Sequence, residues 1–271
     1  MSSDSPAVTE SGRGFFWRRT GAVFAVGLVG VLTLAGTLAL APETLPILPA
    51  LPLELFLVAT VVQPAIFVLI AAALGARLAT AVGLRSHVAA RAGGTTLERP
   101  LRGDLTVMVA LGLGVGLAIV GLDVLFAVVG DVLPPDAGPT SLATVLTSVP
   151  YRFLYGGLTE EVLLRWGFMT LLVWLGWRWT GRPTSPPPAL VWVAIVVAAV
   201  LFGIGHLPAA AELTALTPAS VARVVLLNTV GGIAFGWAYW RYSLEAAMVA
   251  HAATHVVLVA GAIASAVTSR T

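Results

Sequence analysis

The feature that most constrains this chain is a series of apolar stretches, each long enough to cross a bilayer. The stretch 20–42 carries no charged residue, and a membrane-spanning helix needs about 20 consecutive apolar residues. Over the whole chain 58% of the residues are hydrophobic and only 10% are charged, whereas soluble domains have about 25% charged residues. The sequence therefore predicts an all-α fold, a polytopic transmembrane helical bundle.

These stretches divide the chain into seven predicted membrane crossings. They are 20–42, 55–76, 105–130, 140–179, 189–207, 218–240 and 244–268. The stretch 140–179 is too long for one straight crossing, because 40 helical residues would span about 60 Å, twice the hydrocarbon thickness. Gly156 and Gly157 are the expected break, with Thr159 as the N-cap of the helix that follows. An eighth membrane helix is expected if 141–158 forms an element of its own.

The charges between these stretches predict how the protein is oriented. The loop 77–104 is the longest and most basic one, with five arginines, and the positive-inside rule makes it cytoplasmic. The polar tail 1–19 is then cytoplasmic as well. Residues 20–42 favour an uncleaved anchor over a signal peptide, because signal h-regions run only about 7–15 residues. The frequent use of alanine, valine, leucine and arginine favours a prokaryotic source, so we expect a multi-pass protein of a prokaryotic cell membrane.

Two compositional features narrow the possible chemistry and partners. The sequence has no cysteine, which excludes disulfides, thiolate nucleophiles and thiolate metal ligands. The basic residues are spread over several loops rather than gathered on one surface, so no nucleic-acid partner is expected. The expected partners are the lipid bilayer and a peptide or protein substrate.

The most informative stretch places two adjacent carboxylates and an arginine inside an apolar span. Ionisable groups at hydrocarbon depth pair with one another, line a wet cavity or carry out chemistry. Glu161 and Arg165 are four residues apart and share a helical face, so they can pair. Glu160 lies about 140° around the helix from Arg165, at about 100° per residue. One glutamate is thus expected to be held by the arginine while its neighbour points elsewhere.

Three of the four histidines fall within predicted spans. They are His206, His251 and His255, of which the last two share one face of the last helix. Together with the two glutamates and Asn228 they favour a shared site over separate interhelical hydrogen bonds. A carboxylate among helices can act as a general base toward water, while histidines stabilise an oxyanion or bind a metal. The predicted chemistry is therefore hydrolysis.

Structural alternatives exist for each of these residues. The two glutamates can be first-turn acids that complement a helix dipole, and the histidines can simply bridge helices. Asp123 has no second aspartate at similar depth, so we expect a structural carboxylate there rather than half of an aspartyl pair. The sequence also has no H-E-x-x-H zinc helix and no G-x-S-x-G elbow.

Three motifs resemble those of the CPBP (or ABI) family of intramembrane proteases, which contains the type II CAAX prenyl proteases. The family motif E-E-x-x-x-R is found at 160–165, F-x-x-x-H at 202–206, and H-x-x-x-N or H-x-x-x-D is represented at 251–255. The resemblance covers about 140–260. It implies that 140–268 is a CPBP-like catalytic membrane core, preceded by N-terminal membrane helices at 20–139.

The resemblance also implies a role for each matching position. Glu160 corresponds to the catalytic glutamate, which activates water for attack on a peptide carbonyl. Glu161 and Arg165 would support it, in agreement with their expected pairing. His206 and His251 match the essential histidines of the family and would stabilise the oxyanion.

The third motif departs from the family at its last position. His255 stands where the family has Asn or Asp, and it can still donate one hydrogen bond. It also adds a possible metal ligand, so a zinc site is a second possibility. The possible zinc ligands are His206, His251 and His255 with Glu160. The expected cofactor is therefore none, or Zn²⁺ if the protein is a metalloprotease, and the metal-free mechanism is favoured.

The expected function is that of an intramembrane endopeptidase acting on a membrane-associated or prenylated, CAAX-like substrate. Phe202 and Asn228 are expected to contact that substrate. A non-catalytic membrane protein that uses the polar cluster for binding, such as an immunity factor, is the alternative favoured by the altered third motif. A proton-coupled transporter is a further alternative, although the internal repeats of transporters are not visible.

The predicted span boundaries create one difficulty for this site. They put His206 near the outer end of its helix and His251 only about 12 Å from the cytoplasmic end, at 1.5 Å per residue. The two histidines can meet only if the helices tilt or if the span 189–207 lies deeper than its boundaries indicate.

Overall fold

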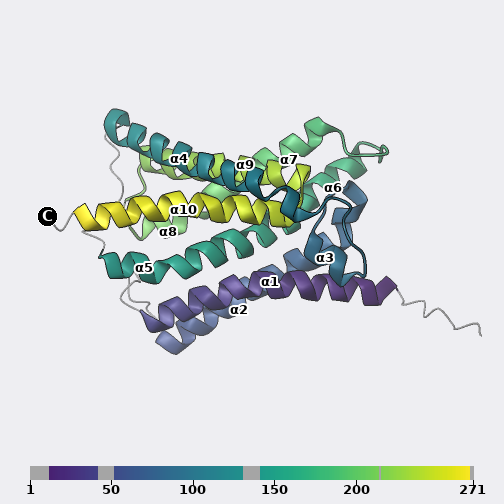
Figure 1. Cartoon of the computed structure of the whole chain (residues 1–271), viewed down its shortest axis with the longest axis horizontal. Helices are drawn as coiled ribbons and strands as arrows, with labels where there is room; N and C mark the ends of the chain where they lie inside the picture. The colour runs from purple at the N-terminus through teal and green to yellow at the C-terminus, as the bar shows by residue number, and fades with distance from the viewer. Residues whose placement is uncertain (1–11, 42–51, 131–140, 214, 269–271) are drawn as a thin grey trace, which may run out of the picture.

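The computed structural model describes residues 12–41, 52–130, 141–213 and 215–268. In this part of the chain the regular structure is helical throughout and contains no strand, as predicted (Figure 1). Most of the predicted tail 1–19 lies outside the described residues, as does the predicted domain boundary at 139–140. The described residues do not test the cytoplasmic position of the tail.

The described residues contain six helices that are long and apolar enough to cross a membrane. They are α1 (Gly12–Leu40), α2 (Leu53–Leu78), α4 (Leu105–Gly130), α7 (Pro188–Gly205) continued by α8 (Leu207–Ala211), α9 (Pro218–Arg241) and α10 (Leu244–Thr268). The helical segment 142–179 lies against α10 and α1 and runs alongside them (Figure 1). The predicted multi-pass helical bundle is therefore confirmed.

The segment 142–179 is one continuous helix, so the predicted break at Gly156 and Gly157 is wrong. It consists of α5 (Leu142–Tyr151), the π-helices η4 (Arg152–Glu160) and η5 (Val162–Met169), and α6 (Thr170–Trp179). A π-helix bonds residue i to residue i+5, so each of its turns holds more residues than an α-helical turn. The segment is therefore shorter than its residue count predicts, and 141–158 does not form an element of its own.

The residues expected to break this helix pack it closely against its neighbours instead. A Cβ atom on Gly156 would lie 2.6 Å from His255 Nε2, and one on Gly157 would lie 3.4 Å from Ala252 Cβ. The Thr159 hydroxyl does not cap a helix but donates to the Gly27 carbonyl oxygen of α1 at 2.6 Å. These residues, whose local propensities favour a helix terminus, therefore serve close packing between helices.

Short local signals set the ends of several helices. Ser86, Ser141 and Thr217 are the N-caps of α3 (His87–Ala92), α5 and α9, and each accepts a hydrogen bond from the backbone N–H three residues ahead. The basic loop 77–104 contains α3 and the 3₁₀ turns η2 (Ala79–Val82) and η3 (Leu101–Gly103). The buried Glu245 of α10 accepts from Ser86 Oγ at 2.5 Å and from two backbone N–H groups of α3, which anchors this loop.

Asp123 of α4 pairs with Arg223 of α9, with Arg223 Nε donating to the carboxylate at 2.6 Å. The contact links two neighbouring helices within the bundle. This agrees with the structural role expected for Asp123.

Glycines on α4 test how closely the bundle is packed. A Cβ on Gly112 would collide with the Ala250 carbonyl oxygen of α10, whereas one on Gly114 would meet nothing within 4 Å. We expect Gly112→Ala to destabilise the protein by about 1–3 kcal/mol through overpacking. Gly114→Ala should instead stabilise it by about 0.5–1 kcal/mol, because glycine is unfavourable inside a helix. Unfolding in mixed micelles measures both, and equal changes would contradict this packing.

Candidate active site

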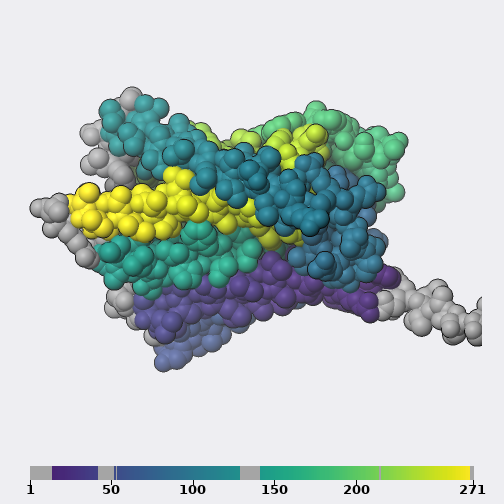
Figure 2. Space-filling view, in the orientation of Figure 1, coloured from purple at the N-terminus to yellow at the C-terminus, as the bar shows by residue number. Residues whose placement is uncertain are grey.

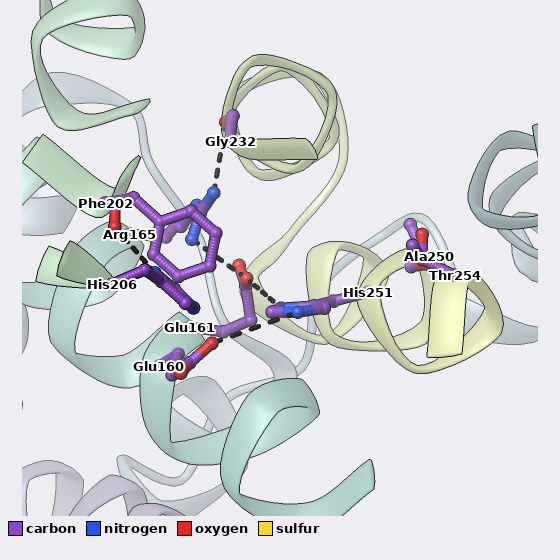
Figure 3. A network of polar contacts seen from close by, with 9 residues as sticks. All are labelled: Glu160, Glu161, Arg165, Phe202, His206, Gly232, Ala250, His251 and Thr254. Carbon is purple, nitrogen blue, oxygen red and sulfur yellow. Dashed lines mark hydrogen bonds and ion pairs between the residues drawn. The ribbon is translucent and has the colours of Figure 1, made fainter. Parts of the chain in front are cut away.

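The centre of the site is a buried ionic cluster between the segment 142–179 and α10. The Glu161 side chain is fully buried, and its Oε1 lies 3.0 Å from Arg165 Nη1 and 2.8 Å from His251 Nδ1. Arg165 Nη2 also donates to the Gly232 carbonyl oxygen of α9 at 3.1 Å (Figure 3). One carboxylate oxygen thus holds both an arginine and a histidine, and the arginine connects the cluster to a third helix.

Two aromatic rings surround this cluster. The Arg165 guanidinium lies 5.1 Å from the centroid of the Phe202 ring and 5.5 Å from that of the Phe235 ring. Phe235 also stacks on His251, with 4.4 Å between ring centroids. These rings keep the cluster dry and hold the imidazole plane in place. The role of Phe235 was not expected, since no motif includes it.

Glu160 has a different environment from its neighbour. Its side chain is 19% exposed, and its Oε2 lies 3.9 Å from His251 Nε2. That separation exceeds a hydrogen bond, and polar groups at such a distance are commonly linked through water. The geometry agrees with the expectation that the arginine holds one glutamate while the other points elsewhere, and it leaves Glu160 free to contact a water molecule.

His206 follows directly after α7, and its Nδ1 lies 2.8 Å from the Phe202 carbonyl oxygen. A carbonyl oxygen can only accept, so Nδ1 carries the hydrogen and Nε2 is left free. The ring points toward Glu160 and His251 (Figure 3). The expected difference in depth is removed because α8 extends this span to Ala211, which places His206 inside the span rather than at its end.

His255 stacks on His251, with 5.1 Å between ring centroids. Both of its ring nitrogens are buried and have no hydrogen-bond partner among the described residues. Asn228 of α9 donates from Nδ2 to the Val224 carbonyl oxygen at 2.8 Å. His255 and Asn228 therefore stand beside the ionic cluster rather than within it.

One cavity of 530 Å³ connects these side chains. The predicted site residues that line it are Glu160, Phe202, His206, Asn228, His251 and His255. Glu161 and Arg165 do not line it, and they lie behind Glu160 and His251. Ligand sites typically measure about 300–1,000 Å³, so the cavity is large enough to take a short stretch of peptide.

Further polar side chains line the same cavity and were not predicted as site residues. They are Tyr151, Arg152, Tyr155, Arg223 and Thr254. The Nε of Arg152 donates to Ser148 Oγ at 2.9 Å. Tyr151 and Tyr155 are four residues apart on the helix that carries Glu160, which is the one local signal that could have indicated them.

The residues considered as zinc ligands do not form a metal site as they stand. In the part of the chain that the structure describes, no three His, Asp or Glu side chains are grouped so that they could hold a metal ion. One nitrogen of His251 is directed to Glu161, and one nitrogen of His206 to a carbonyl oxygen. We therefore derive no step through a metal, and the zinc alternative stays a prediction.

Comparison with known proteins places this site in a defined part of the chain. The family model for type II CAAX prenyl endopeptidases, Rce1-like, matches residues 142–257. No match was found among curated proteins or among solved structures. The matched residues run from α5 into α10 and include every predicted site residue.

Proposed function

Residues 142–257 form a domain of the Rce1-like family of type II CAAX prenyl endopeptidases, and on this premise we propose that Glu160 activates water for peptide hydrolysis within the membrane. The coarse class follows from the family and from the six apolar helices, and it is an integral, multi-pass, CAAX-type protease. The observation that most supports the finer mechanism is the position of Glu160 beside His251 on the wall of a cavity inside the bundle.

In this mechanism Glu161 and Arg165 position His251. Nδ1–H of His251 donates to Glu161, which fixes the ring and turns Nε2 toward Glu160. We propose that Nε2 of His251 also carries a hydrogen, because only then can it donate to an oxygen that becomes negative during the reaction.

The proposed reaction begins with a water molecule in the cavity between Glu160 and the free Nε2 of His206. Glu160 takes a proton from this water, and the water oxygen attacks the carbonyl carbon of the peptide bond. The carbonyl oxygen becomes the oxyanion and accepts a hydrogen bond from His251. Glu160 then returns the proton to the peptide nitrogen as the C–N bond breaks. Every proton that is removed is thus delivered to the leaving amine.

The proposed substrate is a membrane-associated or prenylated, CAAX-like peptide that binds in this cavity. Asn228 lines the cavity at one side and is proposed to contact the peptide. Phe202 is only 6% exposed and packs on Arg165, so its main role is to shape the wall. We place the arginine-rich ends of the helices and the N-terminus in the cytoplasm of a prokaryotic cell.

Cleavage by the full chain tests this proposal. The purified protein in nanodiscs should cleave members of a fluorogenic membrane-peptide library that contains prenylated and unmodified peptides. Metal analysis of the same sample and an assay with chelator separate the metal-free mechanism from the zinc alternative. Absence of cleavage across the library would favour the non-catalytic binding protein, for which the unpartnered His255 is the supporting observation.

A further inference from the structure

A second cavity lies at the end of the bundle where α1 begins and α2 ends. It measures 670 Å³, and its polar lining consists of Arg19 of α1, Arg77 of α2 and Thr80 of η2. Phe15 and Phe16 of α1 supply an aromatic wall. Figure 1 shows that α3 and the connection between α6 and α7 lie at this same end. The cavity therefore sits at the arginine-rich end, which the positive-inside rule predicts to be cytoplasmic.

A smaller cavity of 130 Å³ shares Arg19 and Thr80 with the larger one and is also lined by Arg85. Among the described residues, no carboxylate forms an ion pair with Arg19, Arg77 or Arg85. Arg19 Nε is buried without a hydrogen-bond partner. It lies 2.5 Å from where a Cβ on Gly93 would stand, so the guanidinium packs against the backbone after α3. Figure 2 shows the start of α1 lying against the loop around α3.

An anionic group is the ligand that fits this arrangement. Arginine presents planar N–H donors that match the oxygens of a phosphate, and it is the usual residue for phosphate recognition. The aromatic wall beside Arg19 suits the glycerol and acyl parts of a lipid, and basic pockets between membrane helices bind anionic headgroups. We propose that this cavity binds the phosphate group of an anionic phospholipid.

The smaller cavity also contacts the helix that carries Glu160, the proposed general base. Trp166 of η5 lines the smaller cavity, and its Nε1 donates to the Ala72 carbonyl oxygen of α2 at 3.2 Å. A Cβ on Gly75 would collide with the same indole ring. A headgroup bound in the larger cavity would therefore link α1 to α2 and η2, and through α2 to Trp166, and it should raise the melting temperature of the bundle.

Thermal unfolding of the full chain in detergent tests this proposal without reference to proteolysis. Dioctanoyl phosphatidylglycerol should raise the melting temperature in a saturable manner, whereas dioctanoyl phosphatidylcholine should not. The variant Arg19→Gln/Arg77→Gln should bind phosphatidylglycerol at least about tenfold more weakly. It removes the charged donors that the two arginines offer the phosphate, and hydrogen bonds to charged groups are stronger than those between neutral groups. Arg182→Gln is the matched control, since it removes one exposed arginine outside both cavities and should keep the full response.

Two further experiments distinguish a lipid phosphate from free inorganic phosphate and control for misfolding of the variant. A saturable response to inorganic phosphate equal to that of phosphatidylglycerol would overturn the lipid assignment and identify a free-anion site. Ala81→Trp fills the larger cavity without changing charge and should also lose the phosphatidylglycerol response. An equal response in wild type, Arg19→Gln/Arg77→Gln and Ala81→Trp would show that the lipid binds elsewhere.

Discussion

Replacing Glu160 with Gln should abolish peptide cleavage and leave the fold intact. Glutamine keeps the size of the side chain but cannot accept a proton from water, and loss of a general base typically costs about 10²–10⁴ in rate. The side chain is 19% exposed and its ionic contact to His251 is 3.9 Å long, so little packing depends on its charge. Initial rates in nanodiscs, together with the melting temperature of the same preparations, measure both halves of this expectation.

The control for this variant is Glu98→Gln, which makes the same chemical change on an exposed loop residue outside the site. It should cleave at the wild-type rate. Glu160→Asp keeps the carboxylate but shortens its reach by one methylene, and it should retain measurable activity. A fully active Glu160→Gln protein would remove Glu160 from the mechanism.

The pairing of Glu161 with Arg165 could be predicted because it depends on helical spacing alone. The i, i+4 spacing brings the two side chains together even though the helix around them is π-helical. The bond from Glu161 to His251 could not be predicted in the same way, because the two residues are 90 positions apart and meet only when α10 packs on the segment 142–179. Family motifs named both residues but not their contact.

Two sequence predictions were wrong, namely the helix break at the two glycines and the length of the helix that contains them. Glycines are read as helix breakers because they lack side-chain support, yet Gly156 is the residue that lets His255 approach the backbone. The widened π turns that absorb the extra residues leave no signature in hydropathy. The hydrogen bonds of Glu245 were not predicted either, because its partners Ser86 and α3 lie far away in the sequence. Contacts between side chains that are close in the sequence were predicted correctly. Contacts that depend on the packing of distant helices were missed.

Arg165→Met should be among the most destabilising single substitutions in the chain. It leaves the fully buried Glu161 carboxylate without its guanidinium, and breaking one side of a buried ion pair typically costs about 3–5 kcal/mol. Glu161 Oε2 already has no hydrogen-bond partner within the described residues, so no spare contact offsets the loss. Reversible unfolding in mixed micelles should therefore show a large decrease in stability, and cleavage should fall because the Glu161 carboxylate that holds His251 loses the guanidinium that fixes it.

The double variant Glu161→Gln/Arg165→Met decides whether this loss comes from charge or from packing. Removing both charges avoids a buried unpaired ion, so the double variant should be more stable than the sum of the two single changes predicts. Arg182→Gln is the comparison, because it removes the charge of an exposed arginine and such surface substitutions usually change stability by no more than about 0.5 kcal/mol. Strictly additive losses at 161 and 165 would mean that Arg165 acts through its contacts with the phenylalanine rings and Gly232, and that Glu161 holds His251 unaided.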